Sequence, residues 1–257
     1  MSVLHLMGSD KDGGAETYFL DLVCALSAAG VEQGAVVRPH GRRTAELETC
    51  HVPAVTAPYG GPFDLTTRPR IARMARTLKA RVLVQWMNRP GRFAPRGPWR
   101  RIGRLGGYYD LKYYRGCDLL VANTPDIARY IAANGWPKDR VRTIANFATA
   151  GSSAPIPRAT FDTPEGAPLL LALGRLHKVK AHDVALRALA RLPGAWLWIA
   201  GAGPREAQLK RLAAELRVAD RVRFLGWRDD APALYRAADV CVFPSRFEPL
   251  GNVVIQA

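Results

Sequence analysis

A loop near the end of the chain carries residues that could bind both phosphate and sugar hydroxyls. Residues 240–243 (VCVF) predict a buried strand, and residues 253–255 begin an amphipathic helix. Between them, Gly251 lets a ligand approach the backbone, and Glu248 provides a fixed acceptor for hydroxyl groups. The unpaired N–H groups at a helix N-terminus attract anions. A molecule with phosphates and hydroxyls, such as a sugar nucleotide, therefore suits this loop.

A second loop carries two cations. The run that begins at Leu169, LLLALGRLHKVKAHDVALRALARL, predicts a strand, a loop and a helix. Arg175 and Lys180 lie on the loop, where a planar guanidinium and an ammonium group can bind a diphosphate from two sides. Ordinary surface salt bridges are the alternative interpretation of this pair.

Together the two loops resemble the signature of the retaining glycosyltransferases of family 4, which have the GT-B fold. That signature has a Glu, seven residues and a second Glu; here Glu248 fills the first position and Gln256 the second. The resemblance implies that Glu248 contacts the donor sugar and that Gln256, an uncharged acceptor, lies at the nucleotide ribose. It also implies that Arg175 and Lys180 hold the donor pyrophosphate. Ala181 stands where the family usually has Gly.

A glycine loop also follows the first predicted strand, residues 2–8. Gly13 and Gly14 open a helix that ends at Gly30, and this strand–loop–helix unit has the phosphate-binding geometry of doubly wound folds. A glycine pair alone also makes an ordinary tight turn. The "GGAE" sequence resembles a family-4 loop, which implies a place in the interdomain cleft beside the donor phosphates and the acceptor.

The resemblance implies further donor contacts in the second half of the chain. A G-x-G-P turn follows the predicted strand 196–201, and the strand 221–227 ends in LGW, an edge that holds the nucleobase in the family. Packing in the core is the alternative role for Trp227. The expected donor-binding residues are Gly13, Gly14, Gly201, Gly226, Trp227, Leu250, Gly251, Asn252 and Gln256.

The alternation of strands and helices predicts parallel βαβ units. The expected fold is α/β, of GT-B type, with two Rossmann-like doubly wound domains that face a cleft. Residues 1–147 form the acceptor-side domain, residues 148–168, rich in Ala, Ser, Pro and Gly, form a linker, and residues 169–257 bind the nucleotide-sugar. The second domain shows about four strands rather than about six, so we expect it to be incomplete at its C-terminus.

The net charge of +15 favours an anionic partner; surface charge that only reflects an Arg-rich composition is the alternative. Residues 89–115 mix cations with Trp and Tyr, opposed only by Asp110. We expect loops or short helices followed by a helical segment (YYDLKYYRGCD). This mixture suits an anionic membrane surface or a glycolipid, and it could also stack bases or form a solvated loop with inward-facing tyrosines. The expected acceptor or membrane contacts are Arg89, Arg96, Trp99, Arg100, Arg101 and Arg104.

Many family members have a His after the strand 81–86, and here Gln85, Asn88 or Arg89 occupies that region. We expect no metal, because Asp10 and Asp12 lie in a glycine loop and no other Asp-x-Asp motif stands out. The four cysteines are scattered, which predicts reduced thiols rather than a disulfide or zinc framework. No apolar run reaches the roughly 20 residues of a membrane span. We therefore expect a cytoplasmic protein, peripheral on the inner face of the membrane.

The function that follows is retaining transfer of a sugar from a nucleotide-sugar donor to a glycolipid or cell-surface polysaccharide acceptor of lipopolysaccharide type, without metal or other cofactor and without nucleic acid. Glu248, Arg175 and Lys180 are the expected catalytic residues, and they act by stabilising the departing diphosphate and holding the sugar. The alternatives are an inactive fragment of such an enzyme, a sugar-nucleotide epimerase, and a basic nucleic-acid-binding protein.

Overall fold

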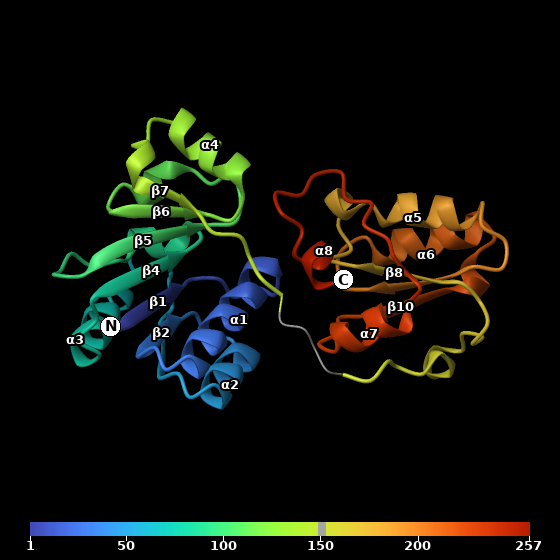
Figure 1. Ribbon diagram of the computed structural model, residues 1–257, viewed down its shortest axis with the longest axis horizontal. Helices are drawn as coiled ribbons and strands as arrows, with labels where there is room; N and C mark the ends of the chain where they lie inside the picture. The colour runs from blue at the N-terminus through green and yellow to red at the C-terminus, as the bar shows by residue number, and fades with distance from the viewer. Residues whose placement is uncertain (149–152) are drawn as a thin grey trace. The chain divides into compact units, whose positions relative to one another are not determined.

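The computed structural model describes residues 1–148 and 153–257 (Figure 1). The chain divides into two units, Met1–Asn146 and Phe147–Ala257, and each has its own sheet and hydrophobic core. Both sheets are built from parallel strands joined by helical connections, as the alternating pattern predicts. Among the described residues, no helix combines the length and apolar character needed to span a bilayer.

Within residues 1–148, seven strands form a sheet in the order β3-β2-β1-β4-β5-β6-β7. The strands are β1 (Val3–Met7), β2 (Gln33–Val37), β3 (Ala54–Thr56), β4 (Val82–Trp86), β5 (Arg100–Leu105), β6 (Leu119–Ala122) and β7 (Val141–Thr143). The helices are α1 (Gly14–Ala28), α2 (Gly41–Thr49), α3 (Thr67–Thr77) and α4 (Pro125–Ala133), with short 3-10 turns η1 (Arg89–Arg92), η2 (Leu111–Tyr114) and η3 (Lys138–Arg140).

Helices cover both faces of this sheet, which is why β1 is buried at all five positions. Successive side chains of a strand point to opposite faces. Leu4 and Leu6 pack with Ile71 of α3 in one core cluster, whereas Met7 packs with Phe19 of α1 in another. Figure 1 shows α3 and the pair α1 and α2 on opposite sides of the strands. The first unit is therefore doubly wound.

β5 corrects one expectation, because Arg100–Leu105 is a central strand between β4 and β6 rather than a loop or short helix. Hydrogen bonds to residues distant in the sequence hold two of its arginines in this place, although Nε of Arg101 is buried without a partner among the described residues. Arg101 donates from Nη2 to Gln85 Oε1 at 3.3 Å and from its backbone N to Asp118 at 2.8 Å. Arg104 donates to Asn146 Oδ1 at 2.6 Å. Of the predicted helical segment after it, only the single turn η2 is helical.

The cysteine expectation is also wrong for one pair, since Cys24 and Cys50 form a disulfide. Cys24 lies in α1 and Cys50 at the end of α2, and the packing of these helices against each other brings their Cα atoms to 5.3 Å. A separation of 26 residues hides this proximity in the sequence. Cys117 and Cys241 are free thiols.

Among residues 153–257, four strands form a second sheet in the order β10-β9-β8-β11. The strands are β8 (Leu169–Leu173), β9 (Trp196–Ala200), β10 (Val222–Gly226) and β11 (Val240–Cys241). The helices are α5 (His182–Leu189), α6 (Glu206–Glu215), α7 (Ala231–Ala237) and α8 (Asn252–Gln256), with 3-10 turns η4 (Arg158–Phe161), η5 (Lys178–Lys180) and η6 (Ala219–Arg221). α5 and α6 pack on one face of the sheet and α7 on the other.

The linker expected at residues 148–168 is shorter than the composition predicts. Residues 149–152 lie outside the described part of the chain, whereas the segment from 153 onward packs on the second sheet. Phe161 meets the Trp198 ring edge-on at 4.9 Å, and Trp198 Nε1 donates to Thr163 Oγ1 at 2.9 Å. Arg158 donates to the carbonyl O of Ala237 at 3.1 Å and pairs with Asp239 at 2.8 Å. This segment is therefore part of the second unit.

Candidate active site

The candidate site lies at the carboxyl edge of the second sheet, where three glycines let neighbouring loops approach closely. Gly174, Gly201 and Gly226 follow or end β8, β9 and β10, and all three have positive φ angles. Gly201 N donates to Gly226 O at 2.6 Å, and a Cβ on Gly201 would lie 2.1 Å from Gly174 O. A side chain at Gly201 would therefore separate the loops. Ligands of open α/β sheets bind at this edge.

The loop after β8 carries both predicted cations. Arg175 is exposed and Lys180 is half-buried. The loop is closed by His182, the first residue of α5, whose Nε2 lies 3.2 Å from Gly174 O. Burial lowers the pKa of His182, which keeps the ring neutral and leaves one N–H to donate to that carbonyl. Ala181, at the N-cap of α5, has the left-handed angles φ 53 and ψ 37, which is the physical reason that Gly suits this position.

Lys180 and Glu248, predicted from separate motifs 68 residues apart, form an ion pair. The Lys180 and Glu248 side chains are 17% and 25% exposed, and the ammonium also lies 5.2 Å from the centre of the Phe243 ring. The backbone N of Arg246 donates to Val179 O at 2.8 Å, which joins the Glu248 loop to the cation loop. The structure thus brings a cation suited to phosphate and an acceptor suited to hydroxyl groups to one place.

Asp183 also connects the cation loop to the loop that carries Glu248, although it was not among the predicted site residues. Its carboxylate pairs with Arg205, just before α6, at 3.4 Å and with Arg246 at 3.1 Å. The acidic residue three positions after Lys180 was the signal in the sequence. Asp183 positions the cation loop relative to the loop that carries Glu248.

The segment after Glu248 turns at Gly251, which has φ +77, and then enters α8. A Cβ on Gly251 would lie 3.0 Å from the Phe243 ring and 3.3 Å from Glu248 Cγ, so this close turn requires glycine. Leu250 and Asn252 flank the turn and are half-buried, whereas Gln256 is exposed at the end of α8. Their roles as donor contacts stay predictions.

The end of β10 contributes to the same edge. Gly226 accepts the hydrogen bond from Gly201, and the Trp227 side chain is 43% exposed. Core packing, the alternative considered for Trp227, is therefore not its role. Beyond it, Arg228 pairs with Asp230 at the start of α7. Contact of Gly226 and Trp227 with a nucleobase stays a prediction.

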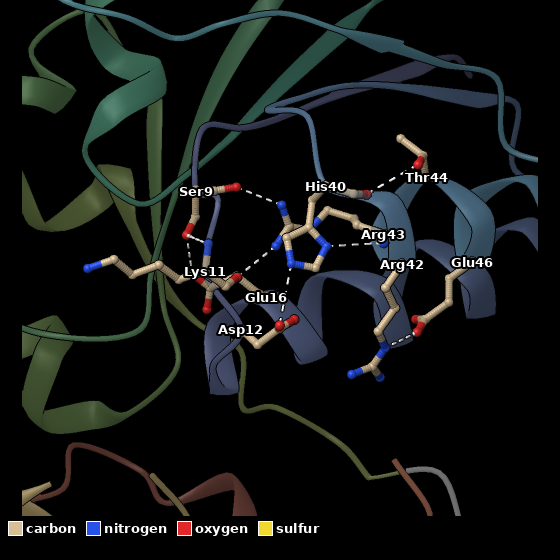
Figure 2. A network of polar contacts seen from close by, with 9 residues as sticks. All are labelled: Ser9, Lys11, Asp12, Glu16, His40, Arg42, Arg43, Thr44 and Glu46. Carbon is tan, nitrogen blue, oxygen red and sulfur yellow. Dashed lines mark hydrogen bonds and ion pairs between the residues drawn. The ribbon is translucent and has the colours of Figure 1, made fainter. Parts of the chain in front are cut away.

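The glycine loop of the first unit is anchored by side chains from the β2–α2 region (Figure 2). Arg43 of α2, only 1% exposed, donates to Ser9 O at 2.6 Å and to Lys11 O at 2.9 Å. Ser9 Oγ in turn donates to Glu16 of α1 at 2.5 Å, and His40 pairs with Asp12 at 3.3 Å. These contacts fix the loop from both ends.

Gly13 and Gly14 follow this anchored segment. Gly13 is the N-cap of α1 in extended conformation, and Gly14 begins the helix. A Cβ on Gly13 would lie 2.9 Å from a carboxylate oxygen of Glu16. Their assignment to the donor stays a prediction. The network around them went unpredicted because its members are 7 to 34 residues apart.

The predicted acceptor or membrane contacts separate into two groups. Arg89, Arg96 and Arg100 are exposed. Trp99 is wrong as a surface contact: it is 8% exposed, packs in the core, and donates from Nε1 to Pro95 O at 3.1 Å. Arg101 and Arg104 are drawn inward by β5. Arg104 is 7% exposed and lies 5.2 Å from the Tyr18 ring, where burial lowers the pKa of its guanidinium.

Two of the residues near the expected histidine position, Gln85 and Arg89, bond to other residues of the first unit. Gln85 is buried, donates to Tyr113 O at 3.2 Å and accepts from Arg101. Arg89 donates weakly to Tyr59 O at 3.4 Å. Within residues 1–148 and 153–257, no group of three or more His, Cys, Asp or Glu side chains is placed to hold a metal ion.

Two Rossmann-like units, with a paired cation and carboxylate at the carboxyl edge of the second, are the arrangement expected of a glycosyltransferase of the GT-B fold. Residues 12–149 match the model of Glycosyltransferase Family 4, and residues 156–257 match that of Glycosyl transferases group 1. The chain belongs to the family-4 glycosyltransferases.

Curated relatives agree with this assignment. The chain is 39% identical over 251 residues to the lipopolysaccharide core biosynthesis glycosyltransferase LpsE of Rhizobium meliloti (strain 1021), covering 96% of this chain and 73% of the relative. It is 37% identical over 264 residues to LpsD of the same strain, covering 100% of this chain and 75% of that one.

Solved structures show the same fold. The chain resembles Anabaena HepE, crystallised with UDP and glucose, with a TM-score of 0.82, 20% identity, and coverage of 100% of this chain and 78% of HepE. A glycosyltransferase from Rickettsia africae gives a TM-score of 0.81 at 17% identity, covering 99% of this chain and 76% of that one.

Proposed function

We propose that the protein transfers a sugar, with retention at the anomeric carbon, from a nucleotide-sugar to a glycolipid acceptor of the lipopolysaccharide core. The ion pair of Lys180 with Glu248 carries this proposal, since it joins a phosphate-binding and a hydroxyl-binding group at the carboxyl edge of the sheet. The names of the Rhizobium relatives favour this acceptor, and the UDP in HepE favours a nucleotide-sugar donor. Because such an acceptor is held in a membrane, we place the reaction in the cytoplasm at the inner membrane face.

In this mechanism the negative charge that grows on the departing diphosphate is stabilised by Arg175 and Lys180. The exposed guanidinium of Arg175 can bind two phosphate oxygens, while Lys180 adds a point charge. Glu248 accepts hydrogen bonds from the sugar hydroxyls. Lys180 reaches the diphosphate from its place beside Glu248, so one ammonium group links the two halves of the donor. The leaving phosphate takes the acceptor proton, and no separate base is needed.

We also propose that the reaction needs no metal ion. The charge that a divalent cation would neutralise is met here by two cationic side chains on one loop. His182 and Asp183 support these cations, since they hold the loop to Gly174 and to Arg246 respectively.

Titration calorimetry with a panel of nucleoside diphosphates tests the donor site first. We expect one base to bind tightly, with an affinity that is unchanged by EDTA. Incubation of the matching nucleotide-sugars with truncated lipopolysaccharide core acceptors should then give a product whose anomeric configuration, read by NMR, equals that of the donor. An epimerised donor formed without acceptor would identify an epimerase instead, and an absence of nucleotide binding would overturn the proposal.

A further inference from the structure

Two large apolar side chains stand in solvent on the loop between β3 and α3. Phe63 is 94% exposed and Leu65 is 82% exposed. Single exposed apolar residues are common on protein surfaces, but two large ones, two positions apart and nearly fully exposed, are not explained by packing within this unit.

The loop that carries them is ordered by the residue between them. The carboxylate of Asp64 accepts hydrogen bonds from the backbone N of Gly60 at 2.8 Å and from the backbone N atoms of Thr66 and Thr67 at 3.0 Å. Both threonine hydroxyls also donate to it. Desolvation opposes ionisation of Asp64, but these hydrogen bonds outweigh it and hold its pKa well below the usual range. The carboxylate is thus directed into the turn, while its two apolar neighbours remain outside.

The surface around this loop is strongly cationic. Residues 51–109 contain twelve Lys and Arg and only one acidic residue, Asp64, whose charge is engaged within the turn. Arg68 donates to the carbonyl O of Arg92 at 3.0 Å, and Arg89 reaches Tyr59 O, so three exposed arginines lie near the start of α3.

The solvent face of α3 continues the positive surface. Ile71 and Ala75 of this helix are buried against the sheet, and the side away from them carries only cations among its charged residues. The exposed cations of α3 and the residues after it are Arg68, Arg70, Arg73, Arg76 and Lys79. None has an acidic partner among the ion pairs of the described residues. An apolar pair beside a uniformly basic helix face is the arrangement that binds anionic bilayers.

We propose that Phe63, Leu65 and the basic face of α3 (Arg68, Arg73 and Arg76) form the docking surface of this protein for an anionic lipid membrane. The two apolar side chains enter the boundary between head groups and acyl chains, and the arginines bind the lipid phosphates. This surface replaces the one expected around Trp99, whose ring is in the core. The inference does not rest on the proposed donor or acceptor, because docking requires neither.

Sedimentation with vesicles tests this surface directly, in the absence of any nucleotide-sugar. We expect the protein to bind vesicles of phosphatidylcholine with about one-third phosphatidylglycerol and to bind pure phosphatidylcholine weakly. The double variant Phe63→Ser/Leu65→Ser should lower the partition coefficient about tenfold at both low and high salt. Arg73→Gln/Arg76→Gln should lower it at least tenfold at low salt, and this difference should shrink as salt screens the charges.

Matched control variants in the second unit are Leu192→Ser, at an exposed apolar residue, and Arg187→Gln/Arg191→Gln, at two exposed cations. These should bind vesicles like the unaltered protein. All substituted side chains are exposed, so circular dichroism and the unfolding midpoint should not change. Equal binding of all variants, equal binding to neutral and anionic vesicles, or an oligonucleotide that binds through the same arginines more tightly than the vesicles would overturn the proposal.

Discussion

Arg43 donates its shortest hydrogen bond, 2.6 Å, to the backbone carbonyl of Ser9, and so ties a helix on one side of β1 to the glycine loop after that strand (Figure 2). Replacement by Met keeps the volume but leaves two loop carbonyls without their donor. We expect Arg43→Met to lower the free energy of unfolding of the first unit by roughly 2–4 kcal/mol. Urea denaturation followed by tryptophan fluorescence would measure it.

The neighbouring residue supplies the control. Arg42 pairs with Glu46 one helical turn away, and its side chain is 36% exposed. Arg42→Met should therefore change stability by less than about 1 kcal/mol. If both variants lost the same stability, the loop contact of Arg43 would not be the cause.

The pairing of Lys180 with Glu248 predicts different effects of removing each partner. Lys180→Ala should weaken binding of the nucleoside diphosphate and lower turnover at least about 100-fold, and Arg175→Ala should behave alike. Glu248→Gln should leave nucleoside diphosphate binding within a few-fold of normal and lower turnover, because it loses the sugar contact. Calorimetry with the nucleotide and a coupled assay of its release would separate the two effects.

Lys210 is the matched control, since it is an exposed lysine of the same unit that pairs with Glu206 at 2.7 Å. Lys210→Ala should retain normal turnover. Near-normal rates in both Lys180→Ala and Arg175→Ala would argue strongly against their assignment to the diphosphate.

Ala181 occupies a left-handed conformation, which costs a residue with a Cβ atom such as Ala about 1 kcal/mol relative to Gly. Ala181→Gly removes that strain, although it frees the unfolded chain and deletes a buried methyl group. We expect a net gain of up to about 1 kcal/mol in unfolding free energy. Ala188→Gly, at an exposed position within α5, should instead cost about 1 kcal/mol. If Ala181→Gly and Ala188→Gly lowered the unfolding free energy equally, backbone strain at Ala181 would be ruled out.

Stability should depend on pH through His5, which is buried between Gln33 and Trp86. Burial lowers the pKa of His5 from 6.5 to about 4. The folded state therefore binds fewer protons than the unfolded state between these values, so stability is greatest above pH 6.5 and falls as the pH drops toward 4. The loss should reach roughly 3 kcal/mol.

Unfolding midpoints measured from pH 7 to 4 would check this dependence against His5→Phe. His5→Phe loses two hydrogen bonds and should be less stable than the unaltered protein at pH 7. Its unfolding midpoint should then fall less steeply between pH 7 and 4, because no histidine is protonated at this position. Parallel slopes of the two curves over this range would refute the assignment.

Local sequence patterns predicted the strands and loops at the carboxyl edge of the second sheet well, because strand, glycine turn and cation lie within a few residues of one another there. Lys180 and Glu248 were predicted from two motifs, and the parallel pairing of β8 with β11 brings them together. The parallel direction of these two strands follows from the alternation of strands and helices along the chain. The sequence does not show which groups pair with Asp183, because its partners Arg205 and Arg246 come from two other loops.

The basic region, residues 89–115, was predicted less well, because its contacts also join residues that are distant in the sequence. Arg101 and Arg104 were predicted as acceptor or membrane contacts, but partners distant in the sequence allow β5 to lie inside the sheet, between β4 and β6. Trp99 was predicted to lie at a membrane interface. In the folded loop its indole N–H instead donates to Pro95 O, which allows the ring to pack in the core. Cys24 and Cys50 likewise became neighbours only through helix packing.

The segment from 153 to 168 has a practical consequence for dissecting the protein. Arg158 bonds both to the end of α7 and to Asp239, and Thr163 satisfies the only polar atom of the buried Trp198 side chain. A fragment that begins at Leu169, the first residue of β8, would expose part of one face of the second sheet and leave the Trp198 indole N–H without its acceptor. Expression of this half alone should therefore begin ahead of residue 153, and a shorter version should precipitate.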